Sequence, residues 1–198
     1  MKFLSIFLLF YYAGFSQVEN HYEKYSAYLF YRSTENKINI IAKDFNLSDT
    51  LMTHVGLGIL FDKEILIYNV NYVDNGNALS VDTFDEFLNI YDIRAFSVWK
   101  LNITKNQYKK LKKNLLEIKS KYYVFDFDFS LSNNEYYCSE FVYDILRNSN
   151  ILSKKINFSK NLNQFYSKAL KRDTLMYIPI DSFQELENIN CIEHKIFK

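Results

Sequence analysis

Two residues of this chain have the chemistry of a nucleophile and its base, Cys138 and His54. Cys138 follows a polar loop over 130–135 and opens an amphipathic helix predicted over 138–150. Free N–H groups at a helix start carry partial positive charge, which favours ionisation of a thiol to the nucleophilic thiolate. A cysteine at a helix start can equally be an inert part of the core, so its placement alone does not decide between these readings.

His54 begins a strand predicted over 54–61, in which Val55 and the apolar residues at every second position after it alternate with small ones. Gly56 and Gly58 cost strand stability, which usually means that another group approaches the backbone closely. A helix packed against this strand would be such a neighbour. The alternative is a partly exposed histidine on an edge strand.

The return strand, predicted over 64–73, supplies two asparagines. A two-residue turn after the first strand would place Asn71 opposite His54 and Asn69 opposite Gly56, with all four on one face. Because Gly56 has no side chain, the carboxamide oxygen of Asn69 could accept a ring proton from His54 on the diagonal. That is the task of the third residue in Cys-His-Asn enzymes. A register slip of one residue, or a solvent-facing strand, would remove this role.

The remaining pattern predicts the elements that must hold these residues in place. Thr104 is the expected N-cap of a helix whose buried face carries apolar residues at helical spacing, at positions 108, 111, 115 and 118. The expected fold class is α+β, with an antiparallel sheet packed against helices. Further strands or turns are predicted over 25–31, 37–44 (strand or helical turn), 74–77, 81–88 (strand, then helical turn), 95–101 and 174–180.

The length, composition and net charge of the chain limit the classes of protein to which it can belong. The chain has 198 residues, of which 48% are hydrophobic and 24% charged, as expected for one globular domain, here 17–198. The net charge of +1 gives no indication of a nucleic-acid partner or of a strongly electrostatic membrane contact.

The first residues have the layout of a secretory signal peptide, 1–16. Lys2 is followed by an apolar run over 3–12 and by the small residues Gly14 and Ser16 before Gln17. We therefore expect a secreted or periplasmic protein without a stable membrane span after signal removal; the alternative is an uncleaved anchor. In such a compartment Cys138 and Cys191 could form a disulfide, and this possibility stays open.

Two segments together resemble a known family. Thr53-His54-Val55-Gly56-Leu57-Gly58-Ile59, followed by Tyr136-Tyr137-Cys138-Ser139-Glu140-Phe141-Val142, is similar to the permuted papain-like amidases of the YiiX-like family. That family belongs to the wider superfamily of NlpC-type peptidoglycan hydrolases and lecithin–retinol acyltransferase. The resemblance covers roughly 25–150, includes 126–129 as an aromatic lead-in, and implies a circularly permuted papain-like (NlpC-type) fold.

The resemblance implies acyl transfer through a thioester, with Cys138 as nucleophile and His54 as base. Asn69 stands where the family usually has Glu, and 26–28 lacks the family's Gly-Asp pair. The backbone amide of Cys138 would help to hold the oxyanion. Tyr136, Tyr137 and Asn71 are expected to contact substrate, although packing is the alternative role for the two tyrosines.

The predicted function is therefore an exported cysteine hydrolase of the amidase or peptidase type. It would act on a small peptide-, amide- or lipid-like substrate, with no cofactor, metal or nucleic acid. The alternatives are a non-catalytic ligand-binding module on the same fold, a lipid acyl hydrolase or acyltransferase, and a disulfide-stabilised structural protein. A metal site of His54 and Cys138 with Asp126 or Asp128 lacks the close ligand pairs usual for zinc.

Overall fold

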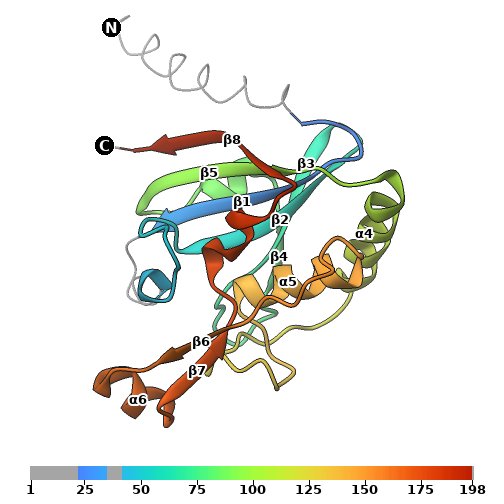
Figure 1. The fold of residues 1–198 in the computed structure, drawn as a ribbon. Coiled ribbons are helices and arrows are strands. Elements are labelled where there is room, and N and C mark those ends of the chain that lie inside the picture. The colour runs from blue at the N-terminus through green and yellow to red at the C-terminus, as the bar shows by residue number, and fades with distance from the viewer. Residues whose placement is uncertain (1–21, 35–41, 198) are drawn as a thin grey trace, which may run out of the picture.

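The computed structural model of the chain describes residues 22–34 and 42–197. Its centre is a six-stranded sheet in the order β4-β3-β2-β1-β5-β8, in which all neighbouring strands are antiparallel (Figure 1). The strands are β1 (Ala27–Thr34), β2 (His54–Phe61), β3 (Glu64–Val70), β4 (Leu79–Asp82), β5 (Ile93–Leu101) and β8 (Ile189–Ile196). The fold class is thus α+β with an antiparallel sheet, as predicted.

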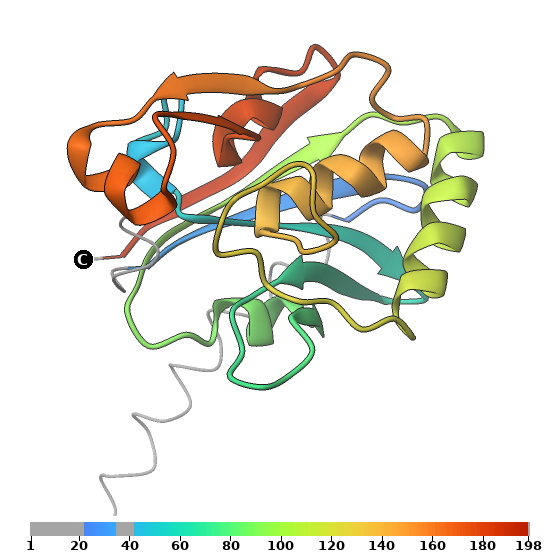
Figure 2. The same cartoon turned by 90° about the horizontal axis from the view of Figure 1, so that it is seen from below.

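Helices cover both faces of this sheet. Helices α4 (Lys105–Ile118) and α5 (Cys138–Asn148) lie side by side and bury their apolar stripes with Leu57 and the other odd-numbered residues of β2 (Figure 2). The short helix α3 (Phe84–Leu88) lies on the other face, where Phe30, Phe84 and Phe87 form an aromatic cluster. The two faces therefore hold separate apolar clusters, one under α4 and α5 and one under α3.

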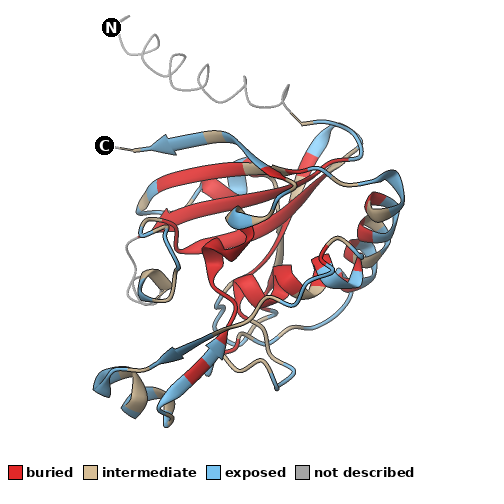
Figure 3. Ribbon diagram, in the orientation of Figure 1, coloured by how far each residue is buried: buried red, intermediate tan, exposed pale blue. Residues whose placement is uncertain are grey.

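A second, smaller sheet stands apart from the first. Strand β6 (Phe158–Asn161) pairs with β7 (Thr174–Tyr177), and helix α6 (Gln164–Leu170) joins them. This hairpin extends away from the main sheet and is mostly exposed (Figures 1 and 3). The 3₁₀ helix η2 (Ile180–Glu185) then leads back to β8 at the sheet edge.

The hairpin of β2 and β3 has the predicted register. Strand β2 has the predicted bounds, 54–61, and residues 62–63 form the two-residue turn. Leu57 pairs with Tyr68, which continues to Asn69 opposite Gly56. Strand β3 ends at Val70 rather than at residue 73, because the chain leaves the sheet for the turn that precedes β4.

The helix starts also agree with the sequence pattern. Thr104 caps α4, with its hydroxyl accepting from the backbone N–H of Gln107 and the Gln107 side chain bonding back to Thr104. Tyr108, Leu111 and Leu115 are buried, as their spacing predicts. Helix α5 begins at Cys138 and ends at Asn148, two residues before the predicted end, because Asn150 has a left-handed φ of 57°.

The glycines of β2 have a different neighbour from the one expected. A Cβ on Gly58 would lie 2.4 Å from the ring of Phe30, and one on Gly56 would lie 2.7 Å from Ile67 and 3.2 Å from Phe87. Only Phe87, from α3, comes from a helix. Glycine is therefore needed at both positions mainly because large side chains of the neighbouring strands occupy the space that a Cβ would fill, and only in part because of a packed helix.

Other boundaries differ from the prediction. Strand β1 is shifted toward the C-terminus relative to 25–31, because Tyr25 has a φ of 71° in the preceding turn. Of the segment 37–44, residues 37–41 lie outside the described part and 42–44 are helical. The predicted strand 174–180 stops at Tyr177, shortly before Pro179, which has no N–H for a ladder.

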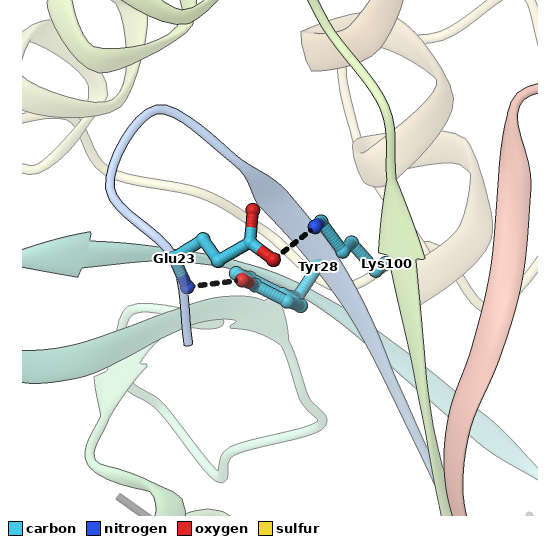
Figure 4. A network of polar contacts seen from close by, with 3 residues as sticks. All are labelled: Glu23, Tyr28 and Lys100. Carbon is cyan, nitrogen blue, oxygen red and sulfur yellow. Dashed lines mark hydrogen bonds and ion pairs between the residues drawn. The ribbon is translucent and has the colours of Figure 1, made fainter. Parts of the chain in front are cut away.

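The start of the described chain is tied to the sheet by polar contacts (Figure 4). The Tyr28 hydroxyl accepts a hydrogen bond of 2.6 Å from the backbone N–H of Glu23, and the Glu23 carboxylate pairs with Lys100 at 2.6 Å. These contacts join the segment before β1 to β5. The predicted signal peptide, 1–16, lies outside the described residues. Within the described residues, no helix has both the length and the apolar character needed to cross a membrane.

Candidate active site

Cys138 and His54 line one cavity of about 510 Å³. It lies where β2 begins and α5 starts, and Leu175 and Tyr177 of the hairpin form part of its wall. Most of its lining side chains are apolar or aromatic, and Arg32, Asn71 and Asp82 are among the polar ones. The structure therefore brings the predicted nucleophile and base to the same solvent-accessible space.

The thiol of Cys138 lies among backbone N–H groups. Helix α5 has Tyr137 as its N-cap, and no side chain of the N-cap bonds to the first turn. The backbone N–H groups of Val55, Ser139 and Cys138 itself lower the pKa of the thiol, but burial outweighs them and the pKa is raised above its ordinary value. The expected easy ionisation at the helix start is therefore not found, because desolvation opposes the charge of the thiolate.

His54 is held by Asn69. Its Nε2 lies 3.0 Å from Oδ1 of Asn69, on the diagonal that the hairpin register predicts. The same asparagine donates from Nδ2 to Asp82 at 2.9 Å. A carboxylate only accepts, so Oδ1 must face the ring and Nε2 must carry the proton. Nδ1 of the neutral imidazole is then left with the lone pair that a general base requires.

A second hydrogen-bond donor fixes the same arrangement from the other end. Arg32 donates from Nη2 to Oδ1 of Asn71 at 2.8 Å, and Asn71 donates from Nδ2 to Oδ1 of Asn69 at 2.5 Å. Because a guanidinium has donors only, each carboxamide between Arg32 and Asp82 has a single consistent orientation. The network thus sets the tautomer of His54 without a carboxylate in direct contact with the ring.

Arg32 and Asp82 were not recognised from the sequence. Arg32 lies directly opposite His54 on β1, is only 5% exposed, also donates to the carbonyl of Phe87 at 2.7 Å, and stacks on the Phe87 ring at 4.4 Å. Asp82 ends β4, and Ser80 also donates to it at 3.1 Å. An arginine in the mostly apolar strand β1 was the sequence feature that could have indicated a role for Arg32. Its position opposite His54 depends on the pairing of β1 with β2, and no turn specifies that pairing.

Burial keeps both groups neutral, and the charge of Arg32 adds to this effect at His54 but opposes it at Cys138. Desolvation lowers the pKa of His54 well below its ordinary value, and the positive charge of Arg32 lowers it further. Desolvation also lowers the pKa of Arg32 to about 10, which still leaves it charged at neutral pH. The thiol and the ring share no hydrogen bond, although both lie in the described part of the chain. The resting state is therefore a neutral thiol beside a neutral imidazole.

The three residues predicted to contact substrate are placed differently. Asn71 and Tyr137 line the cavity, and the Tyr137 hydroxyl also accepts from the backbone N–H of Ile178 at 2.8 Å. Tyr136 does not line it: its hydroxyl donates to Asp144 at 3.2 Å and its ring packs against Phe141. Tyr136 is thus a packing residue, which was the alternative role considered for it.

The remaining candidates shape the structure. Asp126 is fully buried and accepts from the backbone N–H groups of Asp128 and Ser130, so it shapes the loop before α5. Both cysteines are free thiols, with Cys138 buried and Cys191 exposed on β8.

The comparisons with known proteins yield a structural match. No family model matches the chain, and no curated protein matches it. The fold is similar to that of the metalloprotein YiiX from Escherichia coli O157:H7, with a TM-score of 0.66 and 13% identity over 89% of this chain and 100% of that one. At this identity the likeness concerns the fold alone. Among the described residues, no three His, Cys, Asp or Glu side chains group to hold a metal ion.

Proposed function

We propose that this protein is a cysteine hydrolase in which Cys138 attacks a substrate carbonyl and His54 acts as base. The observation that carries the proposal is the cavity shared by Cys138 and by a histidine whose tautomer Asn69 fixes. The fold likeness to YiiX is compatible with a circularly permuted papain-like arrangement of the NlpC type. The proposal includes a secreted or periplasmic location for the mature chain.

The steps begin from the neutral pair. Nδ1 of His54 takes the thiol proton as Sγ of Cys138 forms a bond to the carbonyl carbon. The N–H groups of Cys138 and Ser139 at the uncapped helix start would hold the oxyanion. Imidazolium then gives its proton to the leaving amine or alcohol as that bond breaks, leaving a thioester. Water attacks the thioester, His54 takes one of its protons, and the carboxylic acid leaves as the thiol re-forms.

The cavity lining favours an apolar acyl group on the substrate. Phe45, Phe129, Tyr177 and Ile180 are among the side chains that line it. Such walls bind aliphatic or aromatic groups by excluding water from them. Amide and ester substrates with the same acyl group are therefore the first to compare, and the proposal includes no nucleic-acid substrate.

The test uses intact mass spectrometry on the protein with p-nitrophenyl esters and anilides of two to twelve carbons. We expect an acyl adduct on Cys138, faster with longer chains, that disappears with time as product forms. Cys138→Ala should abolish it, whereas Cys191→Ser on the exposed edge strand should leave it unchanged. Adducts of equal yield on both cysteines, or none at all, would refute the proposal.

A non-catalytic binding module is the second candidate, because the pKa of the Cys138 thiol is raised and no hydrogen bond joins it to His54. This candidate predicts saturable binding of the free acid or amide with no acyl adduct at any pH. Turnover in the same assay would exclude it.

A further inference from the structure

One segment of the chain, residues 154–173, is strongly basic although the net charge of the whole chain is small; we call this segment the basic unit. Residues 154–173 include six Lys or Arg residues and one Asp, a net charge of +5, whereas the whole chain has +1. This unit contains β6 and α6 of the projecting hairpin. The sequence-wide charge predicts no strong electrostatic contact with a membrane, but charge concentrated on one projection acts locally over about a Debye length of 8–10 Å.

Most basic side chains of this unit lie at the surface, but Lys160 donates to the backbone carbonyl of Asp44 and Arg172 is half-buried. Lys154, Lys155, Lys168 and Lys171 are all exposed, and the hairpin protrudes from the main sheet (Figures 1 and 3). Large apolar side chains are exposed beside them, Phe165 at 70% and Met176 at 51%. Exposed lysines interspersed with an aromatic and a flexible apolar side chain are the composition of an interfacial membrane contact.

The unit is anchored to the wall of the cavity. Phe45 packs on Tyr166 at 5.1 Å and on Tyr177 at 5.4 Å, between ring centroids, and the Tyr166 hydroxyl donates to Asp44 at 2.5 Å. Leu175 and Tyr177 of β7 line the space that holds Cys138. The hairpin that would meet a surface is therefore also part of the wall of a largely apolar cavity.

We infer that the basic unit 154–173, together with Met176 of β7, docks the protein on an anionic lipid bilayer and thereby brings the cavity to the lipid surface. The basic residues meet the negative headgroups, and Phe165 with Met176 enters the interface. An anionic polymer would satisfy the lysines but would leave these apolar side chains and the neighbouring apolar cavity without a role. This inference concerns the surface of the hairpin and holds whether or not Cys138 is catalytic.

Helix α4 provides a matched control. It is also lysine-rich, but its apolar face is buried against the sheet, and its lysines do not line the cavity of Cys138. Lys154→Glu/Lys168→Glu and Lys109→Glu/Lys113→Glu change the net charge equally. All variants have the same N-terminal apolar run, so its contribution to binding cancels in the comparison.

The experiment is vesicle sedimentation of the full chain with phosphatidylcholine alone and with 30% phosphatidylglycerol, at two salt concentrations. Since each basic residue near an anionic surface contributes about 1 kcal/mol, we expect the hairpin variant to lose roughly tenfold or more in partitioning. The α4 variant should lose less than about threefold, and Phe165→Ser should weaken binding with little change in its salt dependence. Equal losses in the two charge variants, no preference for anionic vesicles, or binding to polyphosphate and heparin without binding to vesicles would each overturn the inference.

Discussion

Helices α4 and α5 pack against the same face of the sheet, yet their first turns differ. In α4, Thr104 and Gln107 bond reciprocally, so the backbone N–H groups of both residues have side-chain acceptors. In α5 the equivalent positions are Tyr137 and Glu140; the Glu140 carboxylate interacts with the backbone N–H of Tyr137, but Tyr137 returns no side-chain bond. The start of α4 is therefore capped by side chains, which stabilises the helix. The start of α5 has no side-chain cap, and its N–H groups lie beside Cys138 and the cavity.

The first turn of a helix therefore serves stability in α4 and the candidate site in α5. A side-chain cap contributes about 1 kcal/mol to a helix. At α5 that contribution is absent, and a buried thiol stands among the donors instead. Changes around α5 should therefore affect reactivity, and changes at the start of α4 should affect only stability.

The largest effect is expected at His54. Because the resting thiol is neutral, its reaction requires a base, and His54→Ala should lower the rate of Cys138 labelling by iodoacetamide at pH 7.5 about 100-fold or more. His194→Ala, on the exposed strand β8, is the matched control and should leave the rate unchanged. The rate is measured by peptide mapping over a pH series. Equal rates in wild type and His54→Ala would remove His54 as the base.

The next largest effect concerns the acid at the start of α5. Burial, with the negative charges of Asp126 and Asp144, raises the pKa of Glu140 to about 8, and its Oε2 has no hydrogen-bond partner. The folded state then binds more protons than the unfolded state between pH 4.5 and about 8. The free energy of unfolding should therefore fall as pH rises through this window, by an amount on the order of 2 kcal/mol once the shift is discounted for solvent screening of this partly exposed carboxyl group.

Glu140→Gln should remove that fall in the free energy of unfolding, because glutamine does not titrate. Urea unfolding at pH 5, 6.5 and 8 measures it. Glu117→Gln, on the exposed side of α4, should retain the wild-type pH dependence. A variant at position 140 that still loses the same stability between pH 5 and 8 would contradict the assignment.

A smaller effect is expected from Asp82, which acts through Asn69. Asp82→Ala removes one of the two contacts that orient the Asn69 carboxamide and leaves only the one from Asn71, so the tautomer of His54 is held less firmly and the labelling rate of Cys138 should fall about tenfold. Asp85→Ala, on the exposed side of α3, makes the same charge change nearby and should have little effect. A tenfold loss in both variants would mean that charge, rather than orientation, is responsible.

Local patterns predicted the parts of this site that lie within one hairpin or one helix. The register of β2 and β3 follows from a two-residue turn, and it correctly placed Asn69 beside His54. The start of α5 at Cys138 and the cap at Thr104 were likewise predicted from neighbouring residues.

The rest of the site depends on pairings between distant segments. Arg32 meets His54 because β1 pairs with β2 across a long connection, and no turn residue specifies that register. The wall formed by Leu175 and Tyr177 requires the late hairpin to return to the cavity. The raised pKa of the Cys138 thiol likewise depends on its burial in the assembled core, which a helix-start argument does not include.

The smallest effect is expected at the closed helix start. Thr104→Ala removes the hydroxyl that accepts from Gln107, at an exposed position, and should lower the free energy of unfolding by about 1 kcal/mol in urea. The rate of Cys138 labelling should not change, because no residue of α4 lines the cavity of Cys138. If Thr104→Ala lowered the labelling rate while leaving stability intact, the two helix starts would not have separate roles in stability and reactivity.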